Sequence, residues 1–154
     1  MKSGRGQIVR KCIVALLLLA FAGGTAFYLK DLIDRANPDY AIPQITVTAD
    51  SKAVPTITDA YSWSFYVGED VIREETPVPD LALTAADMLG GEALDIIFSQ
   101  PALETKITRT DSYTYTFQRV TDLTVPFESG FYIYNVFARF ERGAVSYYFC
   151  VSVA

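Results

Sequence analysis

The sequence predicts an all-β fold: an immunoglobulin-like antiparallel β-sandwich of about seven strands, preceded by one N-terminal transmembrane helix. Three observations support this prediction. Residues 12–29 carry no charge and are mostly apolar, which is close to the minimum length of a membrane-spanning helix. Aromatic residues make up 14% of the chain, and they favour strands over helices. The remaining residues form short alternating segments separated by turn residues, at a spacing typical of a sandwich.

Residues 1–11 are expected to form a cytoplasmic head. This segment contains basic residues and no acid, whereas all 18 acidic residues of the chain follow Leu29. Because basic residues are retained on the cytoplasmic side of a span, we expect a single-pass protein of the cell membrane, with its N-terminus in the cytoplasm and its C-terminal domain outside it.

Residues 12–36 are predicted to form the transmembrane helix and a juxtamembrane extension. Small residues at 20–22 and 24–26 would also suit cleavage of a signal peptide, so this alternative remains open. Helical spacing of apolar residues continues past the uncharged run, together with two charge pairs at i, i+4, and favours the anchor. The residues concerned are Leu29, Leu32, Ile33 and Ala36, with the pairs Lys30/Asp34 and Asp31/Arg35.

Asn37-Pro38 is expected to end the helix, and residues 37–43 read as an extended linker. Residues 44–154 are then the extracytoplasmic β-sandwich domain, for which a small open barrel is the alternative. One helical turn is predicted at 83–91, where Thr84 and Asp87 have the spacing of a capping box and Gly90 follows. Residues 68–81 are expected to form a charged loop. The predicted strands are 44–49, 60–68, 92–99, 105–109, 112–120, 131–141 and 144–153.

Several aromatic motifs within residues 42–153 are similar to those of small exported proteins of Gram-positive bacteria, many of them uncharacterised lipoproteins. These motifs are AYSWSF, GGEALDIIFSQP, VPFESGFYIYNVFARF and AVSYYFCVSV. The resemblance implies an immunoglobulin-like β-sandwich and brings no known activity. The chain departs from the lipoprotein pattern because no cysteine follows the apolar core, so lipid anchoring at that position is not expected.

The composition argues against several chemistries. The chain has no histidine, which removes histidine-based triads and most zinc sites. Its two cysteines, Cys12 and Cys150, fall on opposite sides of the predicted membrane boundary, so no intrachain disulfide is expected. Nucleophile and phosphate-binding motifs are missing as well, and we expect no enzyme, catalytic residue, metal site or cofactor. The acidic domain disfavours nucleic acid and anionic lipid headgroups as partners.

The strand predicted at 131–141 has apolar residues on both faces. The face with Tyr132, Tyr134, Val136, Ala138 and Phe140 is uncharged and should point into the core. The other face carries Phe131, Ile133 and Phe137. These three side chains either form an exposed contact patch or are covered by the linker or by the charged loop.

Three further features each have two interpretations. Trp63 is either a core anchor or a binding residue that stacks on a sugar. Loop acids are either solvated or bind Ca²⁺. Cys150 is either a buried, inert thiol or an exposed one that joins two chains. The loop acids are Glu69, Asp70, Glu74, Glu75 and Asp80.

The sequence therefore suggests a membrane-anchored, extracytoplasmic binding or protein-interaction module of the bacterial envelope. Its candidate contact residues are Phe131, Ile133, Phe137 and Trp63. The expected partners are the membrane, through the N-terminal helix, and another envelope protein or a second copy of this chain. The alternatives are a structural or accessory envelope protein without a small ligand, and a hydrolase of envelope polymers.

Overall fold

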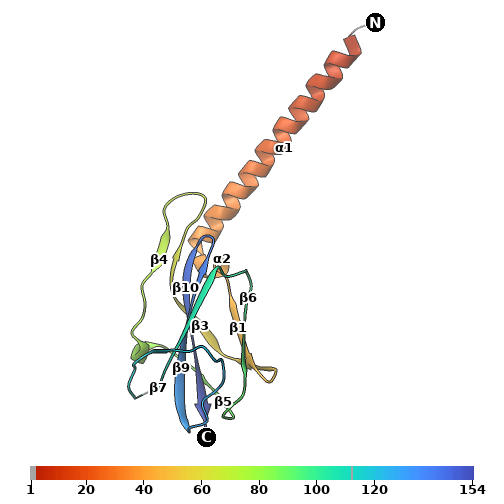
Figure 1. The fold of residues 1–154 in the computed structure, drawn as a ribbon. Helices are drawn as coiled ribbons and strands as arrows, with labels where there is room; N and C mark the ends of the chain where they lie inside the picture. The colour runs from red at the N-terminus through yellow and green to blue at the C-terminus, as the bar shows by residue number, and fades with distance from the viewer. Residues whose placement is uncertain (1–2, 112) are drawn as a thin grey trace.

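A long helix, α1 (Ser3–Ala36), stands away from one end of a β-domain, and the C-terminus lies at the opposite end (Figure 1). The computed structural model describes residues 3–111 and 113–154. A one-turn helix, α2 (Pro38–Ala41), joins α1 to the strands, and a 3-10 turn, η1, occupies Val78–Asp80. The strands are β1 (Ile45–Ala49), β2 (Lys52–Val54), β3 (Thr56–Trp63), β4 (Val71–Arg73), β5 (Ala85–Met88), β6 (Leu94–Phe98), β7 (Glu104–Asp111), β8 (Gln118–Arg119), β9 (Gly130–Phe140) and β10 (Gly143–Val153).

The strands form two sheets, which confirms the predicted β-sandwich preceded by an apolar helix. The smaller sheet has the order β2-β1-β6, and the larger has the order β4-β3-β10-β9-β7-β8. These neighbours are antiparallel. β5 is the exception, because it runs parallel to β10 beside the end of that strand.

Aromatic side chains fill the space between the two sheets. Phe98 of β6 contacts Phe140 of β9 across the sandwich, with ring centroids 5.7 Å apart, and Trp63 meets the same ring at 6.0 Å. Such edge-on pairs stabilise a core beyond the apolar area that they bury. The alternating face of β9 that begins at Tyr132 points into this core, as its sequence predicts.

β9 and β10 are the longest strands, and each begins one residue before its predicted start. The prediction for 112–120 is wrong, because only β8 forms there and Ser112 lies outside the described residues. The carboxylate of Asp111 accepts the backbone N–H groups of Tyr113 at 2.9 Å and Thr114 at 2.7 Å. An aspartate that binds the amides two and three residues ahead favours a turn over a strand.

The helical turn predicted at 83–91 is also wrong, because Ala85–Met88 forms β5. β3 pairs with β10 only as far as Phe149, which leaves the backbone of residues 150–153 of β10 without that neighbour. β5 takes this position, pairing Cys150 with Ala85 and Val153 with Met88. Backbone hydrogen bonds to a central strand thus outweigh a weak local signal for a helix.

The predicted extended linker at 37–43 is a short helix followed by two buried residues. α1 ends at Ala36, as Asn37-Pro38 predicts, but α2 follows at once. Ile42 and Pro43 are buried. The hydroxyl of Tyr147 in β10 donates to the carbonyl oxygen of Pro43 at 2.6 Å. The segment after α1 is therefore part of the domain core and not a free tether.

Candidate functional site

The four candidate contact residues do not form one surface. Trp63 is buried in the core, which confirms its interpretation as a core anchor and leaves it inaccessible to a ligand. Ile133 is buried as well, Phe137 is half-buried, and Phe131 is 48% exposed. The contact patch as predicted is therefore wrong for Trp63 and Ile133.

The cover over Ile133 comes from the same chain. Ile133, Tyr148 and Cys150 pack on the outer face of the larger sheet against side chains of the charged loop and the segment after it. The ring of Phe117, from the segment before β8, meets the ring of Tyr148 at 6.4 Å. The side chains that pack against this cluster are Ile57, Val78, Leu81, Leu83, Ala85 and Phe117.

A pocket of about 450 Å³ opens beside this cover. The hydroxyl of Tyr148 donates to the carboxylate of Glu75 at its wall. Burial, and then this carboxylate, raise the pKa of Tyr148, which keeps the hydroxyl protonated. Buried Asp59 accepts the backbone N–H of Thr76 at 2.9 Å and holds the loop in place. The pocket thus offers the carboxylate of Glu75 and the side-chain amide of Asn135 to a polar ligand. Its lining is Glu75, Thr76, Pro77, Val78, Thr108, Phe117, Asn135 and Tyr148.

The acids of the charged loop do not gather around a metal position. Among residues 3–111 and 113–154, no three potential ligand side chains converge. Glu75 is hydrogen-bonded to Tyr148. The geometry therefore gives no support to a Ca²⁺ site in this loop.

Cys150 is a buried, free thiol. Burial raises its pKa above the ordinary value, so the reactive thiolate is disfavoured. Of the two interpretations of Cys150, the structure therefore supports the buried, inert thiol. Leu83 and Ala85 cover the side chain, so a partner chain cannot reach it.

Exposed apolar side chains gather at the end of the sandwich that lies away from α1. Phe127 is 84% exposed and Leu89 is 73% exposed. Phe131 lies at the same end, because Gly130 and Met88 both pair with Val153 at the end of β10. We call Leu89, Phe127 and Phe131 the distal cluster. It retains one residue of the predicted patch and adds two that the strand pattern did not single out.

Glycines bring two segments of the distal cluster together. A Cβ atom on Gly91 would lie 2.7 Å from ring atoms of Phe127, and Gly91 has a φ of +85°. A Cβ atom on Gly90 would lie 2.7 Å from the Cα atom of Phe127. Only glycine allows the 89–91 turn to approach this closely without strain.

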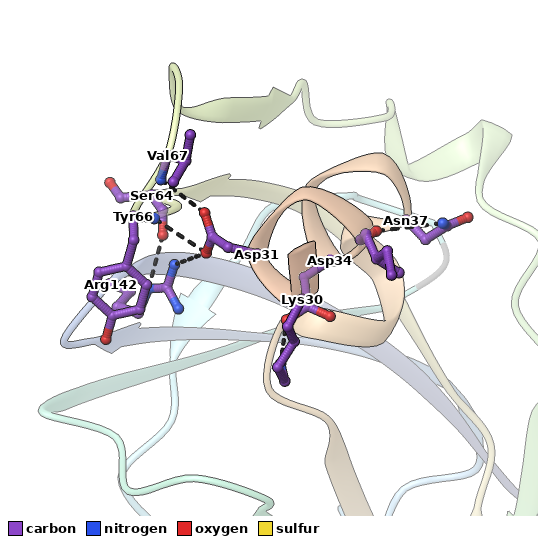
Figure 2. Close-up of polar contacts among 9 residues, drawn as sticks. Lys30, Asp31, Asp34, Asn37, Ser64, Tyr66, Val67 and Arg142 are labelled. Carbon is purple, nitrogen blue, oxygen red and sulfur yellow. Dashed lines mark hydrogen bonds and ion pairs between the residues drawn. The ribbon is translucent and has the colours of Figure 1, made fainter. Parts of the chain in front are cut away.

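The junction between α1 and the sandwich is a second site, which the sequence did not reveal. Asp31 is only 4% exposed. Its carboxylate accepts the backbone N–H of Val67 at 2.7 Å and of Tyr66 at 3.2 Å (Figure 2). The guanidinium of Arg142, from the β9–β10 turn, lies 3.5 Å from the same carboxylate. A buried charge is stable only when it is paired and hydrogen-bonded in this way.

Arg142 completes the junction. Its Nε–H donates to the carbonyl oxygen of Ser64 at 2.9 Å, and its guanidinium lies 4.1 Å from the centre of the Tyr66 ring (Figure 2). Of the two predicted pairs on α1, Lys30 does bind Asp34. Asp31, in contrast, turns away from its predicted partner Arg35 and binds residues remote in sequence.

Comparison of the chain with protein-family models, with curated proteins and with solved structures gives no match. The similarity to exported proteins of Gram-positive bacteria therefore stays a prediction.

Proposed function

We propose that this protein is a single-pass, membrane-anchored interaction module of the bacterial envelope, whose β-sandwich lies outside the cytoplasm. The observation that carries the proposal is α1, in which Gln7–Ala36 is long and apolar enough to cross a membrane and its most apolar window is 0% buried against the sandwich. Exposed apolar surface on this scale favours a lipid environment over water. The basic residues before the span support a cytoplasmic N-terminus.

An anchor suits the geometry better than a cleaved signal peptide. α1 continues unbroken through both small-residue sites, at 20–22 and 24–26, as far as Ala36. The helix is then joined to the domain through Asp31, so the span and the sandwich form one unit. Intact-mass measurement of the membrane-bound protein tests this: the full chain is expected, and loss of the first 22 or 26 residues would contradict the proposal.

The proposed contact surface is the distal cluster, and the proposed partner is another protein of the envelope. Apolar residues exposed together are typical of protein–protein contact sites. The cluster lies at the end farthest from α1 and thus farthest from the membrane in this arrangement (Figure 1). The proposal retains the immunoglobulin-like form of the sandwich and assigns no reaction to it.

Site-specific photocrosslinking in intact cells tests the contact surface. Phe127→p-benzoylphenylalanine places a probe in the distal cluster. Leu103→p-benzoylphenylalanine is the matched control, because Leu103 is also exposed and apolar but lies beside Arg139, toward the α1 end. We expect a discrete protein adduct from position 127 and not from 103. The same adducts from both positions, or none from 127, would contradict the proposal; a structural role without a dedicated partner would then fit better.

A further inference from the structure

We infer that the β3–β4 loop, Tyr66–Gly68, lies in the interfacial layer of the membrane, so that the sandwich rests on the lipid surface in one fixed pose. The inference deepens the proposed function and rests on its claim that α1 spans a bilayer. Figure 1 shows this loop rising beside the last turns of α1. Three observations place the loop in the interfacial layer. They are its position along the length of α1, its exposed aromatic residue, and its contacts with successive turns of the helix.

The level follows from the charges of α1. Residues 12–29 are uncharged, and at about 1.5 Å per residue they span about 27 Å, close to the thickness of the hydrocarbon core. Lys30 is the first charged residue after this run and marks the outer edge of the core. Asp31 follows directly, and its carboxylate binds the amides of Tyr66 and Val67. These two residues therefore lie at the boundary between hydrocarbon and headgroups.

Tyr66 reaches back toward the hydrocarbon. Its ring centre lies 5.0 Å from that of Phe27, one turn of helix nearer the membrane than Asp31. Tyr66 is nevertheless 67% exposed, so most of its surface faces the space around the helix, which lipid occupies in a membrane. A tyrosine with an apolar ring and a polar hydroxyl is favoured at this level of a bilayer.

Successive turns of α1 contact the loop, which fixes the orientation of the sandwich relative to α1. Phe27, Asp31 and Arg35 follow one another at intervals of four residues and form a single stripe along the helix. Phe27 packs on Tyr66 and Asp31 binds its amide. Arg35 lies over Gly68, where an added Cβ atom would come within 2.2 Å of its guanidinium.

A second link lies beyond the stripe, where Arg73 of β4 pairs with Asp39 of α2 at 2.7 Å. Contacts spread over this length of helix resist bending of the domain about its anchor.

The acidic composition of the domain does not oppose this contact. The expectation that the domain is repelled by anionic headgroups rests on total charge, whereas at the junction basic side chains pair with acidic ones beside exposed aromatic surface. Lys30 pairs with Asp34, and Arg142 pairs with Asp31. Arg35 lies over Gly68. Glu69 and Asp70 follow the loop, so the inferred contact with lipid rests on the exposed ring of Tyr66 and not on attraction between charges.

Photocrosslinking to lipid tests the inference in the full chain, reconstituted in vesicles of phosphatidylethanolamine and phosphatidylglycerol. p-Benzoylphenylalanine replaces Phe27, Tyr66 or Tyr113 in separate variants, and intact-mass spectrometry detects lipid adducts. Tyr113 is an exposed aromatic residue that follows the last residue of β7, Asp111, by two positions. Asp111 pairs with Tyr132 at the end of the larger sheet that lies away from α1. We expect lipid adducts from positions 27 and 66 and none from 113.

The other outcomes separate this inference from the proposed function. Adducts from 27 alone would overturn the inference and leave the membrane anchor intact. No adduct from 27 would overturn the anchor and the inference together, whereas adducts from all three positions would overturn the fixed pose.

A second pair of variants tests the link itself. Asp31→Ala removes the acceptor for both loop amides. Asp34→Ala is the matched control, because the Asp34 side chain binds Lys30 on another side of the helix (Figure 2). We expect Asp31→Ala to lower the lipid adduct from position 66 several-fold relative to that from 27, and Asp34→Ala to leave the ratio unchanged. An equal effect of the two substitutions would contradict the role of Asp31.

Discussion

Replacing Tyr147 by phenylalanine should loosen the connection between α1 and the sandwich. Tyr147 is fully buried, and its hydroxyl donates to the carbonyl oxygen of Pro43 at 2.6 Å. Burial raises the pKa of Tyr147 well above its ordinary value near 10, so the hydroxyl remains a donor at any pH used for the assay. Tyr147→Phe keeps the ring in the core and removes only this donor.

The magnitude follows from what the substitution leaves behind. Pro43 is fully buried, so its carbonyl oxygen would lose its donor and gain no water in exchange. A buried acceptor left without a partner costs about 1–3 kcal/mol, and 2 kcal/mol corresponds to about a 30-fold change in the folded-to-unfolded ratio. With a urea m-value of about 2 kcal/mol/M, the unfolding midpoint should fall by about 0.5–1.5 M.

The assay is urea unfolding of the full chain in detergent micelles, followed by the fluorescence of Trp63, the single tryptophan of the chain, which is buried in the core. Tyr134→Phe is the matched control. Tyr134 is equally buried, but its hydroxyl lies 3.5 Å from the carbonyl oxygen of Thr124, a weak contact. We expect the control to lose less than about 1 kcal/mol. Equal losses in the two variants would refute the role given to the Pro43 bond.

Three further predictions concern the sandwich. Gly143→Ala should lower the free energy of unfolding by about 1–3 kcal/mol in the same urea assay, because its Cβ atom would lie 2.0 Å from a carbonyl oxygen of β3. An unchanged urea midpoint would contradict this, because it would mean that the β9–β10 turn shifts without cost. Cys150 should resist alkylation by N-ethylmaleimide in the folded protein and react only after unfolding, because it is buried and its pKa is raised; mass mapping of the labelled peptide decides this. Lys106 and Arg139 lower the pKa of Glu104 below its ordinary value of 4.5, so this carboxylate stabilises the fold above about pH 4.5 and loses that effect as the pH falls through the lowered value. Glu104→Gln should therefore lower stability at pH 7 and flatten its decline on acidification, and an unaltered pH profile would contradict this.

The two long C-terminal strands could be predicted closely from the sequence. Gly130–Phe140 and Gly143–Val153 lie within one residue of their predicted bounds, because long runs of aromatic and β-branched residues between turn residues indicate strands. The period of two correctly assigned the core face of β9 from Tyr132 to Phe140.

β5 could not be predicted in this way. Its four residues, Ala85–Met88, lack alternation and become a strand only because the end of β10 offers free backbone groups. The turn after Asp111 replaced a predicted strand for a different, local reason, because the side chain of Asp111 competes for the backbone amides. A short strand such as β5 depends on a partner strand that local sequence does not specify.

The candidate site, too, could be predicted only in part from the sequence. The sequence showed that β9 has apolar residues on both faces, but not that Phe117 and the segment 78–85 cover Ile133 while leaving Phe131 exposed. The distal cluster joins Leu89 to Phe127 through the close approach of the 89–91 turn, and these residues are far apart in the chain.

The sequence by itself determined the apolar helix, the sandwich and the core face of β9, because composition and periodicity over a few residues are enough to decide them. Only the tertiary structure decided how these parts are joined. Asp31 reads as half of a local pair with Arg35, yet it is buried against Tyr66, Val67 and Arg142. A charge enters a low-dielectric junction only where donors converge on it. Those donors come from loops that the fold, and not the local sequence, brings to the end of the helix.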